Sequence, residues 1–430
     1  MFLTDLLQPF MLTVIGGTVK ASYVGLGHTF NRKENGNPVQ TRADLNIYGG
    51  DVTFVALYMG YELTSYDSHV LSTVNMYDGS FTLTSVFRFG QTYCKANTGP
   101  EPHATFNLYG GSFNHTATTG DSGTRMGWLN SKADGDKTQS RASDATLNIY
   151  GGAYNESERI HMGCNASTSR INLHGGVLKA ENIILNDATS TAKYGTGRTF
   201  FAGGKAYIYW NGGMYAPVGT AAADQTLTGL TEVLVSTNGA VVTTAELAGE
   251  SYTIAQPLLH DPDLEGTDGG FVKKGAKPLA LTGANTYTGD TVVEDGTLSI
   301  PVGANASALP AGSAVVVAEG ATLEMAAGTV ARAGGLRVEM GTQSGTLAGF
   351  APAADGALYV TGVGETQRKG LEMPVTVTDA QQPNKLTRWA VYVDGDLDDR
   401  LSAFVRKKAN SESEHTIVLD GKQGLYLIVR

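Results

Sequence analysis

Four acidic residues stand close together in the segment DPDLEGTD, which fits a metal-binding loop better than any other part of the chain. Asp261, Asp263, Glu265 and Asp268 surround the turn residue Gly266. Carboxylates at alternating positions before a glycine let one loop wrap a Ca²⁺ ion, which prefers oxygen ligands. The segment has no downstream glutamate at EF-hand spacing. A calcium site and an acidic linker both fit these residues, and we expect no other cofactor.

Hydrolysis of a glycosidic bond requires acidic residues that act as a pair, with carboxylates about 5–9.5 Å apart. Acidic residues do not recur at equal positions of the repeat described below, where Asp78 is isolated. Arg88, Arg125 and Arg159 stand at similar positions and predict a basic column, which fits an acidic sugar or a solvated row of charge. The histidines show neither an HExxH motif nor triad spacing. We therefore predict no catalytic residues.

An internal repeat in the first half of the chain provides the elements that position these side chains. The motif reads LNIYGG at 45–50, FNLYGG at 106–111, LNIYGG at 147–152 and INLHGG at 171–176, with VNMYDG at 74–79 as a variant and LTVIGG at 12–17 and IYWNGG at 208–213 as degenerate end copies. An apolar residue followed by glycine recurs after most copies, as at Met59 and Gly60 or Phe89 and Gly90. Each repeat thus predicts three short strands separated by tight turns, and no helix.

Strand alternation sorts the motif into inward and outward residues. The Leu and Ile positions are predicted to point inward, while two outward ladders form along stacked coils. One ladder would contain Asn46, Asn75, Asn107, Asn148 and Asn172, and the other Tyr48, Tyr77, Tyr109, Tyr150 and His174. Exposed aromatic rings fit a platform for sugars or for another protein, and stacked identical side chains also stabilise a solenoid by themselves. Both interpretations fit the sequence.

The composition favours a repeat protein over an ordinary globular one. The 430 residues include 55 glycines without a triplet period, and the net charge is −10. A net anion would be repelled by nucleic acid and by an anionic membrane surface, so neither partner is expected. No apolar stretch is long enough to predict a transmembrane segment. The start, MFLTDLLQPFMLTVIGG, lacks the charged region of a signal peptide.

The segment FVKKGAKPLALTGANTYTGDTVVEDGTLSI at 271–300 resembles the autotransporter-associated β-strand repeat. The matching positions are Leu279, Leu281, Thr282, Gly283, Asn285, Thr286, Tyr287, Thr288, Gly289, Thr291, Val293, Gly296, Thr297 and Leu298. Asp290 replaces the second glycine of the family's pattern, and Pro278 stands where a small or polar residue is usual. The resemblance implies a solenoid building unit of an exported β-helical protein of Gram-negative-type bacteria, located outside the cell or on its surface.

The predicted fold is all-β: a right-handed parallel β-helix, or β-solenoid, with a small antiparallel C-terminal cap. We expect coils of the LNxYGG type at 1–216, a further β-helical region at 217–345, and a β-rich cap at 346–430 with hairpins turned at DG and GKQG. Cys94 and Cys164 would lie two coils apart, beyond the reach of a disulfide at equal height, which favours two free thiols over a disulfide formed through loop excursions.

The predicted function is that of a non-enzymatic surface or secreted protein, passenger-like or adhesin-like, which presents ladders and loops to a glycan or a surface protein. The alternative is a carbohydrate-active β-helix enzyme, either a polysaccharide lyase or a glycosidase. An acidic pair in a groove would favour the enzyme, and its absence would favour the binding protein.

Overall fold

The computed structural model describes residues 2–3, 10–27, 33–34, 37–38, 40–60, 69–90, 103–117, 123–127, 143–163, 167–185, 203–342, 345–363, 368, 370–381, 383–408, 411 and 413–421. They form strands, turns and the 3-10 helices η3 (Ala222–Asp224) and η4 (Pro383–Arg388), with no α-helix among them. The chain divides into two compact units, one of residues 1–234 with 247–249, and one of residues 235–246 with 250–430.

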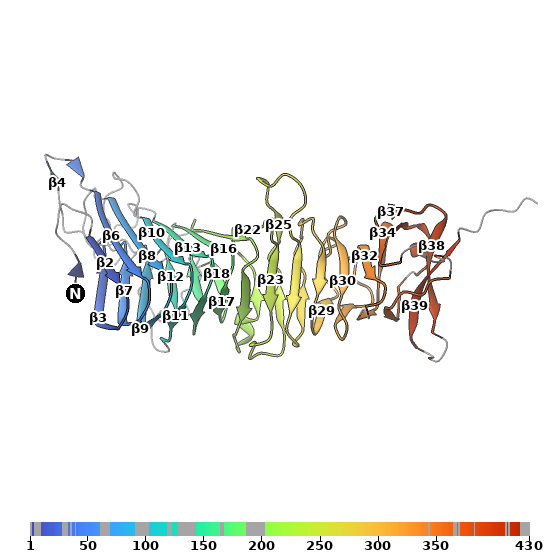
Figure 1. Ribbon diagram of the computed structural model, residues 1–430, viewed down its shortest axis with the longest axis horizontal. Coiled ribbons are helices and arrows are strands. Elements are labelled where there is room, and N and C mark those ends of the chain that lie inside the picture. The colour runs from blue at the N-terminus through green and yellow to red at the C-terminus, as the bar shows by residue number, and fades with distance from the viewer. Residues whose placement is uncertain are drawn as a thin grey trace, which may run out of the picture. The chain divides into compact units, whose positions relative to one another are not determined.

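Parallel strands that pair in chain order build the first unit. The first sheet contains β2 (Phe10–Val14), β6 (Gln40–Ile47), β8 (His69–Met76), β10 (His103–Leu108), β13 (Asp144–Ile149), β16 (Thr168–Leu173), β19 (Lys205–Trp210) and β22 (Glu232–Val235). Figure 1 shows β6, β8, β10, β13 and β16 side by side. Such strands lie about 4.8 Å apart. Each strand therefore belongs to one coil of a solenoid-like stack.

Further parallel strands form the other faces of these coils. One series runs through β1 (Phe2–Leu3), β3 (Thr18–Leu26), β7 (Asp51–Met59), β9 (Ser80–Phe89), β11 (Ser112–His115), β14 (Ala153–Glu156), β17 (Val177–Ala180) and β20 (Met214–Pro217). A second series continues from β9 through β12 (Thr124–Met126), β15 (Ile160–Met162) and β18 (Ile183–Leu185). The remaining strands of this unit are β4 (Lys33–Glu34), β5 (Asn37–Pro38) and β21 (Thr226–Leu227). Three strands per coil, as predicted, occur from β10 onward, whereas β7 and β9 each run along two faces without a break.

The register of the first sheet places like residues over one another. Leu45 pairs with Val74, which pairs with Phe106, and all three side chains are completely buried. Alternate residues of the same strands point outward, since successive side chains of a strand lie on opposite faces. The coil interior is filled with aromatic rings, such as Phe113, whose ring centroid lies 4.5 Å from that of Tyr154. Stacked apolar columns thus form the core of the unit.

The glycine pair of the motif is required by close approach between coils. Gly152 has a φ of +70°, and a Cβ atom there would lie 2.4 Å from the carbonyl oxygen of Gly111 in the preceding coil. A Cβ at Gly151 would lie 2.5 Å from the carbonyl oxygen of Tyr109. Side chains at either position would force the corners of adjacent coils apart, which explains why the pair repeats with the motif.

The second unit is also built from parallel strands, on shorter coils. One series contains β23 (Ala240–Thr243), β26 (Phe271–Lys274), β28 (Thr291–Val293), β30 (Ala314–Val317), β32 (Ala333–Glu339), β34 (Pro352–Thr361) and β36 (Ala390–Val393). The other contains β24 (Tyr252–Ile254), β27 (Leu279–Leu281), β29 (Thr297–Ile300), β31 (Thr322–Met325), β33 (Thr346–Ala348) and β35 (Thr376–Thr378). The strand β25 (Leu259–His260) lies between β24 and β26 in the chain.

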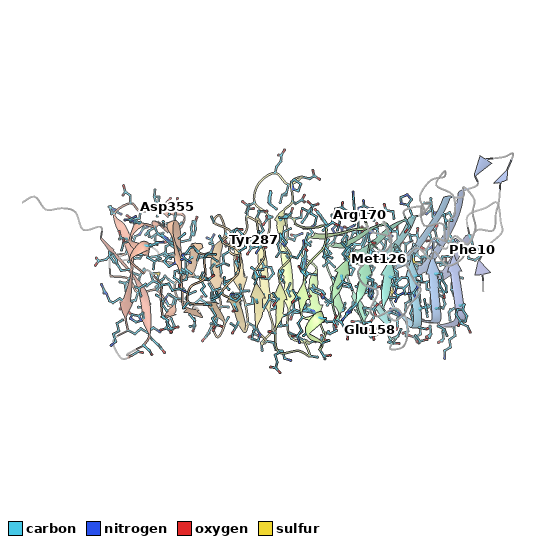
Figure 2. The ribbon with its side chains drawn as sticks, turned by 180° about the vertical axis from the view of Figure 1, so that it is seen from behind. Phe10, Met126, Glu158, Arg170, Tyr287 and Asp355 are labelled. Carbon is cyan, nitrogen blue, oxygen red and sulfur yellow. The ribbon has the colours of Figure 1, made fainter. Side chains whose placement is uncertain are left out.

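Buried polar side chains hold the loops of these shorter coils together. The side chain of Asn285 accepts a hydrogen bond from the Leu258 amide at 2.9 Å and donates one to the Ala308 carbonyl at 2.8 Å. It therefore joins loops of three successive coils. Tyr287, which is completely buried like Met126 of the first unit (Figure 2), shares a hydrogen bond of 2.7 Å with Thr291. Asn285, Tyr287 and Thr291 are all positions of the repeat motif, so the motif encodes the internal bonds of a coil.

Antiparallel strands end the second unit. The strand β37 (Asp396–Leu397) pairs with β36 through a tight turn in which Asp394 and Gly395 both have positive φ, as the DG signal predicts. The strands β38 (Leu401–Lys407) and β39 (His415–Gly421) form a second antiparallel pair. Except for Gly421, the predicted GKQG turn lies outside the described residues.

The first testable prediction concerns Asn285. Replacement of Asn285 by alanine leaves a buried amide and a buried carbonyl without partners, and each such group costs about 1–3 kcal/mol. We expect the free energy of unfolding to fall by about 2–5 kcal/mol in urea titrations followed by circular dichroism. Hydrogen exchange at the Leu258 amide should accelerate. Asn305→Ala is the matched control, because the Asn305 side chain is exposed and bonds only within its own loop. An equal loss in both variants would contradict the role of Asn285.

Candidate functional site

The outward face of the first sheet carries a continuous ladder of asparagine side chains. Each amide nitrogen donates to the amide oxygen of the preceding coil, with lengths of 2.8, 2.8, 2.7 and 2.7 Å. The members in order are Asn46, Asn75, Asn107, Asn148 and Asn172. Because every internal member both donates and accepts within the ladder, these amides stabilise the stack of coils.

The aromatic ladder runs beside the asparagine ladder, just before the glycine corner. Its members are Tyr48, Tyr77, Tyr109, Tyr150 and His174, whose neighbouring ring centroids lie 4.6–4.9 Å apart with planes within 8° of parallel. The four tyrosines are 39–50% exposed. Parallel rings at this spacing cover one another's faces, so the ladder presents ring edges and hydroxyl groups to solvent. A sugar cannot stack on the face of an internal member, and binding by this ladder stays a prediction.

The asparagine ladder ends at β19, where Tyr209 pairs in register with Asn172, and in the neighbouring column Tyr207 pairs with Arg170. The ring of Tyr209 is tilted by 51° from that of His174, so the parallel stacking stops there. The asparagine hydrogen bonds stop at the same coil, because a tyrosine occupies the next ladder position. The degenerate motif IYWNGG carries this signal in the sequence, since its second residue, Tyr209, replaces the asparagine.

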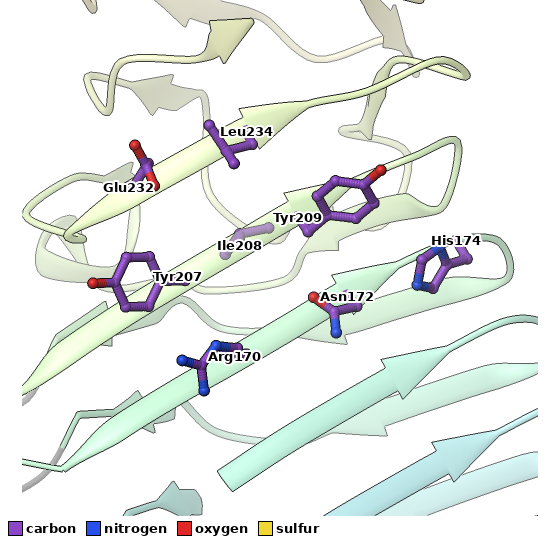
Figure 3. Close-up of a pocket in the computed structure, with 8 residues that line it drawn as sticks. All are labelled: Arg170, Asn172, His174, Tyr207, Ile208, Tyr209, Glu232 and Leu234. Carbon is purple, nitrogen blue, oxygen red and sulfur yellow. The ribbon is translucent and has the colours of Figure 1, made fainter. Parts of the chain in front are cut away.

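A hollow of about 360 Å³ opens at this point in the first unit. Its lining consists of Arg170, Asn172, His174, Tyr207, Ile208, Tyr209, Glu232 and Leu234. Figure 3 shows the two tyrosines of β19 between Arg170 and Asn172 of β16, with His174 just after that strand, on one side and Glu232 and Leu234 of β22 on the other. Aromatic rings thus lie beside a guanidinium, an amide and a carboxylate. Of these lining residues, the sequence predicts only Asn172 and His174 as members of the two ladders.

The charges around the hollow are partly neutralised. Arg170 forms an ion pair of 2.6 Å with Asp144, and its guanidinium carbon lies 5.7 Å from the ring centroid of Tyr207. Burial lowers the pKa of His174 from its ordinary value, so its imidazole is neutral at pH 7. Glu232 is the one carboxylate among the residues that line the hollow. The site can therefore stack a ring, donate hydrogen bonds and accept them, with one negative charge beyond the Arg170–Asp144 pair.

The predicted basic column is wrong in one member and in its exposure. Arg88 pairs in register with Arg125, but the next residue in the column is His161 rather than Arg159. Arg88 and Arg125 are 5% and 0% exposed, so they form no solvated row of charge. Arg159 instead pairs with Asp224, and its Nη2 lies 2.8 Å from a carboxylate oxygen. The sequence showed the spacing but not which side of the strand faces the interior.

A histidine and a glutamate meet inside the first unit, where no sequence motif had indicated them. His115 Nδ1 lies 2.7 Å from Glu156 Oε2, and His115 Nε2 lies 2.7 Å from the Ser85 carbonyl oxygen. The Thr124 hydroxyl donates to the same carboxylate at 2.6 Å. The side chains of His115 and Glu156 are both 0% exposed. A pair that could transfer protons in an open site is here enclosed, and it satisfies its own hydrogen bonds.

The acidic loop does not gather its carboxylates. Asp261 is buried and accepts hydrogen bonds from Ser236 Oγ and the Asp263 amide, whereas Asp263 and Glu265 are exposed. Asp268 is buried, and it accepts hydrogen bonds from His260 and three backbone amides. Burial alone would raise the pKa of Asp268, but these donors lower it below its ordinary value. The two buried carboxylates, Asp261 and Asp268, accept hydrogen bonds within the protein, and calcium binding by this loop stays a prediction.

Within the described ranges, no three histidine, cysteine, aspartate or glutamate side chains lie close enough together to share a metal ion. The part of the chain that the structure describes contains no helix long and apolar enough to cross a membrane. Cys94 and Cys164 lie outside the described residues, and so do most residues of the polar loops between coils.

The enclosed histidine generates a prediction about pH. Burial alone would lower the pKa of His115, but attraction and hydrogen bonding by Glu156 raise it above its ordinary value. This contribution to stability is complete below about pH 6.5, the ordinary value for histidine, and is lost as pH rises through the pKa of the folded protein.

In the wild type, this contribution to the free energy of unfolding should fall as pH rises above 6.5. We expect the Glu156→Gln variant to lack this fall. Denaturant titrations at several pH values measure it. His103→Gln is the control, because the His103 side chain is 45% exposed. If the Glu156→Gln variant had the same pH profile as the wild type, the assignment would be wrong.

Comparisons with known proteins bear on the second unit. No curated protein and no solved structure matched the chain. Residues 271–300, which form β26 to β29, match the family model described as passenger-associated-transport-repeat. The match confirms the resemblance of this segment to the autotransporter-associated repeat, so the chain contains a repeat similar to those of autotransporter passenger proteins.

Proposed function

We propose that the chain is an exported, passenger-like and adhesin-like β-helical protein that contacts a glycan or a surface protein without catalysing a reaction. The observation that carries this proposal is the passenger-associated-transport-repeat at 271–300, whose polar positions form the internal bonds of coils. A segment of this kind builds a scaffold. The same family match supports export to the outside of the cell or to its surface.

Contact rather than catalysis is supported by the acidic residues of the first sheet. Its strands carry Asp44, Asp144 and Glu232. Asp144 lies three strand spacings from each of the other two, which is about 14 Å along the stack at the strand spacing of parallel sheets. Paired carboxylates of glycosidases lie about 5–9.5 Å apart. Glu232 is the one carboxylate among the residues that line the hollow, and the His115–Glu156 pair is enclosed.

A carbohydrate-active enzyme is the second candidate, since a hollow with arginine, tyrosine and glutamate contains groups that lyases and glycosidases use. A binding role requires only that these groups hydrogen-bond and stack. The binding role is favoured because no second carboxylate lines the hollow.

The finer features of the fold belong to the same proposal. We infer a right-handed coil, because parallel strands joined by crossover connections are right-handed in about 98% of cases. The antiparallel strands β36 to β39 are proposed as a cap that protects the last coil from edge pairing. The division of the chain into coils of the LNxYGG type at 1–216, a further β-helical region at 217–345 and a β-rich cap at 346–430 belongs to the same proposal.

Incubation with polysaccharides tests the choice between contact and catalysis. We expect the purified chain to release no reducing ends and no unsaturated uronates from neutral or acidic polysaccharides. Hydrolysis would require the carboxylate pair that the hollow lacks. Assays of reducing sugar and of ultraviolet absorbance measure both products. Reproducible release that disappears in Glu232→Gln would replace the proposal with the enzyme.

Protease treatment of intact bacteria that express the gene tests the location. We expect the chain to be degraded by protease added outside the cells, as judged by an antibody against it, while a cytoplasmic marker stays intact. Protection of the chain until the cells are lysed would contradict surface display.

A further inference from the structure

We propose that the hollow between β16, β19 and β22 binds a neutral saccharide, which stacks on the tyrosines of β19 and hydrogen-bonds to Arg170, Asn172 and Glu232. The inference rests on the proposed contact function, and it names the class of ligand and the residues that recognise it. Nothing in the repeat at 271–300 contributes to this site, which lies entirely in the first unit.

Two columns of the sheet change their residue type at the hollow. The position of Arg170 is occupied by Thr73, Thr105 and Thr146 in the three preceding coils. The position of Tyr209 is occupied by asparagine in the five preceding coils, from Asn46 to Asn172. In one column threonine is thus replaced by an arginine. In the adjacent column, asparagines that bond to one another are replaced by a tyrosine. Stability of the stack does not require this change, because the preceding coils do without it.

The second step is the hydrogen-bonding capacity that the break leaves at the site. Each amide oxygen from Asn46 to Asn148 accepts the amide of the following coil. Asn172 donates to Asn148, but the residue after it in the column is Tyr209, which has no amide. The oxygen of Asn172 therefore receives no ladder hydrogen bond, and Asn172 is one of the residues that line the hollow. A ligand hydroxyl can supply the missing donor.

The third step is the nature of the surfaces. Tyr209 is tilted by 51° from His174, so the face-to-face series of the ladder does not continue across the hollow. A pyranose ring has an apolar face of C–H groups and a rim of hydroxyls that both donate and accept. The hollow offers the complement, with aromatic rings, the donors of Arg170 and the acceptors of Asn172 and Glu232. Its volume of about 360 Å³ lies in the range of small-ligand sites.

The fourth step is charge, which selects neutral over acidic sugars. The positive charge of Arg170 is balanced by Asp144 at 2.6 Å, and His174 is neutral at pH 7. Glu232 then leaves the site with a net negative charge, as the whole chain has. A uronic acid would approach this carboxylate with like charge, whereas a neutral hexose can donate hydrogen bonds to it.

The decisive variant is Arg170→Thr combined with Tyr209→Asn, which restores both columns to the residues of the preceding coils. The new threonine matches Thr146, and the new asparagine amide can donate to Asn172. We expect the fold to be kept, with an unfolding midpoint equal to that of the wild type or higher. The probes are maltohexaose, cellohexaose, mannohexaose and the N-acetylglucosamine hexamer, with hexagalacturonate as the acidic probe.

We expect the wild type to bind at least one neutral hexamer in isothermal titration calorimetry, and the double variant to lose about 10–100-fold in affinity. Tyr109→Phe is the matched control on the same face, because the ring of Tyr109 is covered on both sides by Tyr77 and Tyr150. That variant should bind as the wild type does. Glu232→Gln should increase binding of hexagalacturonate, because it removes the uncompensated carboxylate.

Three results would overturn the inference. They are binding of no neutral hexamer by the wild type, equal binding by the wild type and the double variant, and preference of the wild type for hexagalacturonate. In the second case a glycan is bound elsewhere and the proposed contact function stands. Cleavage of a probe would instead overturn the proposed function, since a contact protein releases no product.

Discussion

Parallel pairing of each coil with the next is the constraint on which the rest of this structure depends. Backbone hydrogen bonds about 4.8 Å apart keep adjacent coils in register, so residues at one position form a column. Glycine pairs at the corners allow that approach, because a Cβ at Gly151 or Gly152 would meet a carbonyl of the coil below. Leu45, Val74 and Phe106 then form an apolar column without further instruction. Residues that occupy the same motif position in successive repeats therefore lie stacked in space.

Columns of identical residues offer few hydrogen-bonding groups and few ring faces to a ligand. Stacked amides use their donors and acceptors on one another, as from Asn46 to Asn172, and stacked rings cover one another's faces, as from Tyr48 to His174. Such columns stabilise the coil and leave little for a ligand. Recognition requires a position where a column is interrupted. Two neighbouring columns are interrupted in successive coils, one at Arg170 of β16 and the other at Tyr209 of β19.

Polar groups inside the coils follow the opposite rule, since burial demands that each find a partner. Asn285 bonds to backbone groups of two neighbouring coils, and Asp268 accepts three backbone amides and a histidine. His115 and Glu156 satisfy each other in the first unit. These residues have the types of catalytic or metal-binding groups, but their capacity is used within the protein. Residue type alone therefore overstates the chemistry of such a chain.

The sequence by itself determined the repeat, its corners, the alternation of its strands and the segment similar to a passenger repeat. These features depend on local rules, namely the period of two in a strand and the need for glycine where backbones approach. Only the tertiary structure decided which polar residues are enclosed, as for Arg88, Arg125 and the carboxylates of Asp261 and Asp268.

The tertiary structure also brought Arg170, Tyr209 and Glu232 together. The three residues lie on successive coils of unequal length, and motif spacing does not say which residues of unequal coils lie side by side. That relation is set by hydrogen bonds between coils, so the site exists only once the coils are stacked.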